Sequence, residues 1–206
     1  MKFLFIVVVA ILFSPFTVLS QSHPAKHSPY KKFPEIYQHR DSLIRFITPD
    51  KNYTYWEYDD GGMDTTKDGT IIYSSGIKPA GVTFKDPQGS MLMGCLPAFC
   101  YKYIAYVHNG KVGYISSDKG LRDFMGPIDN LEKAVLLAEI MENLFPDEDK
   151  RGGSYLATAK GYDLILTNYI LCPITKEAFR VTIDTKGIVK KVKLRAYSKS
   201  TDCAEI

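Results

Sequence analysis

The chain has 206 residues, of which 45% are hydrophobic and 24% are charged, a composition typical of a globular protein. This length suffices for one domain with a substantial core, and a second full domain would be cramped. The formal net charge of +3 argues against nucleic acid as a partner, because duplex-binding domains carry a stronger and more concentrated positive charge.

The N-terminus has the features of a secretory signal peptide. Lys2 precedes the apolar run 3–13, which a Ser-Pro step ends, and small residues lead to a predicted cleavage site after Ser20. The apolar run is shorter than the roughly 20 residues that a helix needs to cross a bilayer. We therefore expect residues 1–20 to be removed and the protein to be secreted or periplasmic, with no stable transmembrane segment in the mature chain. An uncleaved anchor that extends to Leu19 is the alternative.

Export changes how the four cysteines are interpreted. In an oxidising compartment an even number of cysteines predicts disulfides, here two, with three connectivities. We favour Cys95–Cys100 and Cys172–Cys203, because the predicted C-terminal strands bring the second pair together. A zinc site is disfavoured by the C-x4-C spacing of the first pair and by the absence of histidine beside the second. No metal or other cofactor is expected.

The first third of the folded chain contains a helix and three short strands. Residues 21–33 have no apolar periodicity and predict a flexible tether. From Pro34, apolar residues recur at helical spacing and predict a short amphipathic helix that ends before Pro49. Aromatic and β-branched composition predicts strands at residues 53–58, 70–74 and 81–85.

Two strand-like runs within residues 101–115 meet at Asn109-Gly110. Asn-Gly predicts a hairpin with a type I′ turn, because both residues tolerate positive φ. The run on each side has apolar residues on both faces, so we expect the hairpin to be covered on both sides or at least shielded at one end. The turn sets a register in which opposite residues are Val107 and Val112, Tyr106 and Gly113, and Ile104 and Ile115.

One long helix and a strand meander complete the prediction. Asp129 and Glu132 resemble a capping box, and Pro146 marks the end of a helix with apolar residues around most of its circumference. The preceding residues 118–124 predict only a short turn. Beyond the helix, alternation of apolar and polar residues predicts four antiparallel strands at 154–158, 162–171, 178–184 and 188–199.

These elements predict an α+β fold in one domain that covers residues 34–206. The hairpin and the four-strand meander form a mainly antiparallel sheet that packs on the one long helix, with a short N-terminal helix beside it.

The last two strands carry the candidate binding surface. Basic residues alternate with apolar ones there, which predicts a basic row on the outer face of the sheet. Such a row suits an acidic protein surface, an anionic glycan or another anionic surface such as lipid headgroups. The candidate residues are Arg180, Lys191, Lys193, Arg195 and Tyr197.

No catalytic residue is identified. The chain lacks the G-x-S-x-G elbow of a serine hydrolase, oxidation would consume the cysteine thiols, and His108 borders a turn without a recognisable partner. The leading interpretation is therefore an exported, non-enzymatic binding or interaction module of the cell envelope or extracellular space. One alternative is a hydrolase that acts through carboxylates near the loop 59–69. The same loop lacks the residue spacing of an EF-hand, so a calcium site there is disfavoured. Another is an inhibitor-like envelope protein that inserts the hairpin or the 95–100 loop into a partner.

Overall fold

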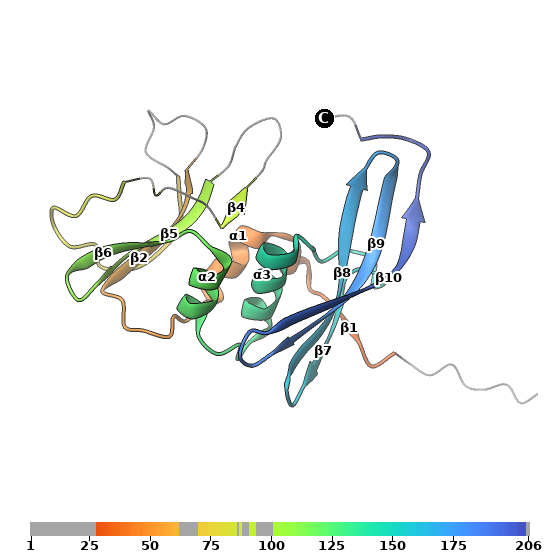
Figure 1. Cartoon of the computed structure of the whole chain (residues 1–206), viewed down its shortest axis with the longest axis horizontal. Coiled ribbons are helices and arrows are strands. Elements are labelled where there is room, and N and C mark those ends of the chain that lie inside the picture. Colours follow the sequence, from red (N-terminus) through yellow and green to blue (C-terminus); the bar gives the residue numbers. More distant parts are fainter. Residues whose placement is uncertain (1–27, 62–69, 86, 88–90, 94–100, 205–206) are drawn as a thin grey trace, which may run out of the picture.

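The structure is a computed structural model that describes residues 28–61, 70–85, 87, 91–93 and 101–204. Two antiparallel sheets lie at opposite ends of an elongated molecule, and the helices lie between them (Figure 1). Residues from both sheets and from the helices belong to one continuous hydrophobic core. The helix layer therefore joins the two sheets into one folded unit.

The C-terminal sheet, which we call sheet A, has the strand order β1-β7-β8-β9-β10. Its strands are β1 (Lys31–Lys32), β7 (Ser154–Thr158), β8 (Gly161–Leu171), β9 (Ile174–Asp184) and β10 (Val189–Lys199). The four-strand meander predicted from the sequence is confirmed. Phe33, at the end of the predicted tether, is buried in the core, so the segment 31–33 is part of the packed domain.

The second sheet, which we call sheet B, has the order β3-β2-β5-β4, and β6 also pairs with β5. Its strands are β2 (Tyr55–Gly61), β3 (Thr70–Gly76), β4 (Leu92–Met93), β5 (Tyr101–His108) and β6 (Lys111–Ile115). The β5–β6 hairpin has the predicted register, and its turn residues Asn109 and Gly110 have φ of 50° and 71°. Residues 81–85 were predicted to form a strand and do not.

The middle layer contains short helices. They are the 3-10 turns η1 (Glu35–Gln38) and η2 (Ile44–Phe46) and the α-helices α1 (Arg40–Leu43), α2 (Asp118–Met125) and α3 (Leu131–Glu142). Every residue of α3 from Lys133 to Ile140 is buried, because the helix has packed structure on all sides. Its N-cap is Asn130, which accepts a hydrogen bond from the Lys133 amide, rather than the predicted Asp129.

The predicted fold class is wrong. The protein is mostly β, with two sheets and three short α-helices, rather than one sheet packed on one long helix. The hairpin does not join the meander, because β2 pairs along the whole length of β5 and brings β3 with it. The N-terminal helix breaks into three pieces, none of which has a capping side chain. Residues 118–125 form a helix, which Ser117 caps.

A disulfide joins Cys172 to Cys203, 31 residues further along the chain, at one end of sheet A. Backbone hydrogen bonds on either side of it tie residues 200–204 to the turn between β8 and β9. This bond is compatible with an extracellular or periplasmic location. Cys95, Cys100 and the predicted signal peptide lie outside the described residues. Within the described ranges, no helix is long and apolar enough to cross a membrane.

Candidate ligand-binding site

The face of sheet B that points away from the helices is covered by the protein itself. The ring of Phe84, from the segment 77–85, stacks on Tyr55 with the ring centroids 6.1 Å apart. The Lys78 ammonium group lies over the Phe84 ring and pairs with the buried Glu57 carboxylate at 3.2 Å. Glu57 also accepts a 2.6 Å hydrogen bond from the Tyr55 hydroxyl. On this face Phe84 also packs edge-on against Tyr114 of β6, whereas Val112 is 44% exposed, so the hairpin is only partly covered on this side.

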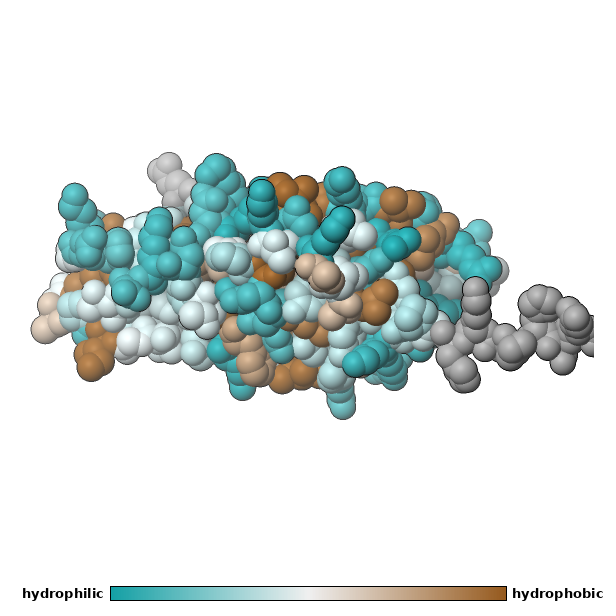
Figure 2. Space-filling model, turned by 90° about the horizontal axis from the view of Figure 1, so that it is seen from below, coloured by the Kyte–Doolittle hydropathy of each residue, from teal (hydrophilic) through white to brown (hydrophobic). Residues whose placement is uncertain are grey.

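Among the described residues, the outer face of sheet A is open along β10. Figure 2 shows that hydrophobic residues reach the surface in separate patches among hydrophilic ones. On β10, Val192 is 61% exposed and Leu194 is 47% exposed. Leu194 contributes to a hollow of about 440 Å³, whose floor also contains Ile165 of β8 and Ala178 of β9. A hollow of this size lies within the range of small-molecule sites, about 300–1,000 Å³.

A β-bulge in β10 shapes this hollow. Lys193 pairs with Phe179 and Ala196 pairs with Glu177, so both Leu194 and Arg195 stand opposite the single residue Ala178. Two residues against one is the pattern of a bulge, which re-aims side chains. The bulge directs Leu194 and Arg195 into the same hollow.

The bulge also divides the predicted basic row. Lys191 stands opposite the core residue Val181, on the face toward the helices, and pairs with Glu142 of α3 at 2.6 Å. Arg180 and Arg195 are on the open side, where Arg180 stands opposite Val192. The predicted residues therefore do not form a single outer row. The register already separates Arg180 from Lys191 and Lys193, and the extra residue of the bulge then separates Arg195 from the two lysines.

Most of the predicted basic residues are already neutralised. Lys193 pairs with Glu177 at 2.8 Å, and Arg180 makes a two-pronged contact with the buried Asp163 carboxylate. Hydrogen bonds and the charge of Asp163 raise the pKa of the Arg180 guanidinium further above its usual range. Within the described residues, Arg195 makes no ion pair. It is therefore the predicted basic residue whose charge is left for a partner.

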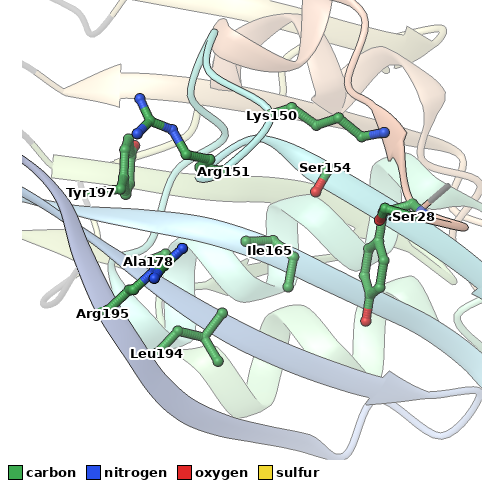
Figure 3. Close-up of a pocket in the computed structure, with 10 residues that line it drawn as sticks. Ser28, Lys150, Arg151, Ser154, Ile165, Ala178, Leu194, Arg195 and Tyr197 are labelled. Carbon is green, nitrogen blue, oxygen red and sulfur yellow. Dashed lines mark hydrogen bonds between the residues drawn. The ribbon is translucent and has the colours of Figure 1, made fainter. Parts of the chain in front are cut away.

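Two other cations stand at the rim of the hollow (Figure 3). Lys150 makes no ion pair with any residue that the structure describes. Arg151 binds both carboxylate oxygens of Asp149 and lies 5.3 Å from the centroid of the Tyr197 ring. The rim therefore has two unneutralised positive charges, on Lys150 and Arg195.

Tyr197 forms a fixed wall of the hollow. Its hydroxyl lies 2.6 Å from the Thr167 hydroxyl, which donates a hydrogen bond to the carbonyl of Gly152. A Cβ on Gly152 would stand 2.1 Å from the Tyr197 hydroxyl oxygen, so only glycine allows this close approach. Burial raises the pKa of Tyr197 to about 12. The phenol is thus neutral at physiological pH.

Two further hydroxyl groups line the site. Ser154 of β7 is only 2% exposed, and its side chain makes no hydrogen bond to any described residue. Figure 3 shows its oxygen directed toward the interior of the hollow. Tyr30 also lines the site, and burial, reinforced by the nearby Asp163 carboxylate, raises the pKa of its phenol. The hollow thus has an aliphatic floor with hydrogen-bond donors and positive charge around it.

Acidic residues of sheet B and of the neighbouring helix α1 have a different arrangement. Lys102 stands between Asp41 and Asp60, with its ammonium nitrogen 2.8 Å and 3.4 Å from their carboxylates. The ammonium group of Lys102 therefore lies between the two carboxylates and offsets their mutual repulsion. The rest of the predicted acidic loop, residues 62–69, lies outside the described residues, as does the 95–100 loop. No described cluster of histidine, cysteine and acidic residues is suited to hold a metal ion.

The sequence revealed part of this site. Arg195 and Tyr197 were predicted to contribute to a binding surface, and both line the hollow. Ser154, Ile165 and Lys150 were missed, because they come from three separate segments that only the sheet topology brings together. Comparison of the chain with protein-family models, with curated proteins and with solved structures finds no match.

Proposed function

We propose that this protein is an exported, non-enzymatic binding module that takes an anionic partner on the outer face of sheet A. One observation carries the proposal: Lys150 and Arg195 stand at the rim of an open hollow without a carboxylate partner among the described residues. Every other basic residue discussed above on sheet A has an acidic neighbour within contact distance. Unneutralised cations beside an apolar floor favour an anion that also has an apolar part.

Capture of the purified protein on immobilised anionic, neutral and cationic ligands tests this proposal. An anionic polysaccharide and vesicles that contain an acidic phospholipid serve as the anionic ligands. We expect the protein to be retained on at least one anionic ligand. In the double variant Lys150→Gln/Arg195→Gln, binding to that ligand should be about tenfold or more weaker, because each charge-assisted hydrogen bond contributes strongly to the free energy of binding.

The matched control is the double variant Lys160→Gln/Lys199→Gln, which removes the same charge from the β7–β8 turn and the end of β10, outside the hollow. It should change retention by no more than about twofold, as expected for screened surface charges. Equal retention of the two double variants would show that net charge, rather than the hollow, is responsible, and would discard the proposal.

A further inference from the structure

The chemistry of the hollow narrows the class of ligand. Its floor is aliphatic, made by Ile165, Ala178 and Leu194. Tyr30 and Tyr197 also line the hollow, but the residues of its floor are aliphatic and offer no aromatic ring on which a sugar could stack. An alkyl chain, by contrast, gains about 0.8 kcal/mol for each CH₂ group that it buries. The floor therefore suits a hydrocarbon segment.

The polar groups around this floor suit a carboxylate. The guanidinium of Arg195 is a planar fork that matches the two oxygens of a carboxylate. The Ser154 hydroxyl is directed into the hollow, makes no hydrogen bond to a described residue and offers a further donor (Figure 3). Lys150, across the hollow from Arg195, adds positive potential. Among the described residues that line the hollow, none is acidic and would repel an anion.

We infer that the hollow on the outer face of sheet A binds a medium-chain fatty carboxylate. The alkyl chain lies on Ile165, Ala178 and Leu194, and the carboxylate binds the Arg195 guanidinium. This inference rests on the proposed function, because it specifies the anion that the same face receives. The hollow is open on one side, so part of the chain stays in contact with solvent.

Isothermal titration of the purified protein with decanoate, decanol and decyltrimethylammonium tests the inference at pH 7. These probes share one chain length and differ in the charge of the head group. We expect decanoate to bind at least about tenfold more tightly than decanol, because a charged hydrogen-bonded pair is lost with the alcohol. The cationic probe should bind more weakly still.

Variants assign the binding to the hollow. Arg195→Gln should weaken decanoate binding about tenfold, and Arg195→Lys should have a smaller effect because the charge remains while the fork is lost. Leu194→Gln should weaken it about fivefold by adding a polar group to the floor. The matched control is Val192→Gln on the same strand, which lies outside the hollow and should change the affinity by less than about twofold. Arg195, Leu194 and Val192 are exposed, so these variants should fold.

The outcomes separate this inference from the proposed function. Equal affinities for decanoate and decanol, or an unchanged affinity in Arg195→Gln, would overturn the inference. A second outcome is that decanoate shows no binding while capture on an anionic polysaccharide or acidic vesicle still depends on Arg195 and Lys150. In that case the fatty-acid assignment is wrong and the proposed function stands. If neither experiment depends on these residues, both fall.

Discussion

Sheets A and B each bury one face against the helix layer, and they differ in what covers the other face. In sheet B, the chain folds back over its own sheet, so that Phe84 stacks on Tyr55 and Lys78 neutralises Glu57. In sheet A, the corresponding face has a hollow with an aliphatic floor and two cations that no described carboxylate neutralises.

This difference indicates how stability and binding are divided in the molecule. A buried charge is costly unless it is paired, and sheet B supplies the pair from its own sequence. At the hollow of sheet A, the Lys150 and Arg195 cations stay near solvent, where an unpaired charge costs little free energy. Substitutions on the outer face of sheet B should therefore affect folding, and those in the hollow should affect binding.

The largest effect is expected from Tyr55→Ala in sheet B. Tyr55 is 6% exposed, and its loss would remove the ring on which Phe84 stacks and one hydrogen bond of the buried Glu57 carboxylate. Removing a buried aromatic side chain costs about 3–5 kcal/mol, so urea denaturation should show a decrease in the free energy of unfolding of that size. A decrease below about 1 kcal/mol would contradict the description of this face as covered.

The next largest effect concerns the end of sheet A. The double variant Cys172→Ser/Cys203→Ser should lose about 3–4 kcal/mol of stability, because the disulfide closes a loop of about 30 residues in the unfolded chain. Urea denaturation measures this loss against the wild type, and the variant should respond to a reductant less than the wild type does, because only the predicted Cys95–Cys100 bond remains to be reduced. Unchanged stability after reduction would show that this bond does not hold the sheet together.

The helix layer between the sheets should make stability depend on pH. Burial raises the pKa of Glu139 from 4.5 to about 7, even though Arg40 contacts its carboxylate at 3.0 Å. A carboxyl whose pKa rises on folding binds more protons in the folded state, so this group stabilises most below pH 4.5 and its contribution is lost as the pH rises to about 7. The loss is about 3 kcal/mol, at about 1.4 kcal/mol for each pKa unit.

The variant Glu139→Gln isolates this contribution. An amide does not titrate in this range, so the decrease in the free energy of unfolding between pH 4.5 and 7 should be smaller in the variant than in the wild type. Denaturation curves recorded at several pH values measure this difference. Parallel pH profiles for the two proteins would show that Glu139 is ionised throughout the range.

A smaller effect is expected where sheet A supports the hollow. In Gly152→Ala, the new Cβ would stand 2.0 Å from the Thr167 hydroxyl oxygen and would displace Tyr197. Overpacking of this kind costs about 1–3 kcal/mol, which thermal or urea denaturation can measure. The variant should also bind decanoate more weakly, because Tyr197 forms the wall. Unchanged stability and affinity would show that Tyr197 is not held against Gly152.

The smallest effect is expected from Leu194→Ala in the hollow, which is the matched counterpart of Tyr55→Ala. Leu194 is already 47% exposed, so its truncation should change the free energy of unfolding by less than about 1 kcal/mol in urea denaturation. A decrease in the free energy of unfolding comparable with that of Tyr55→Ala would show that the outer faces of both sheets contribute equally to stability, which would contradict the difference described between the sheets.

Local signals predicted much of this fold, and non-local pairing was missed. Asn109-Gly110 predicted the hairpin and its register, and alternation predicted the strands of the meander. Nothing in the spacing of residues 53–74 shows that β2 pairs with β5 and so forms a second sheet. The bulge at Leu194 and Arg195 was also invisible, because the residue types alternate through it without interruption. The hollow depends on that bulge, so only two of the residues that line it were predicted.

Methyl-resolved NMR during a decanoate titration tests the central claim most directly, since it compares the two sheets in one experiment. We predict chemical-shift changes for the methyl groups of Ile165 and Leu194 in sheet A, and none for Ile71, which is 49% exposed on sheet B. Changes that are equal at Ile71 and Leu194, or that are confined to sheet B, would contradict the assignment of binding to the outer face of sheet A.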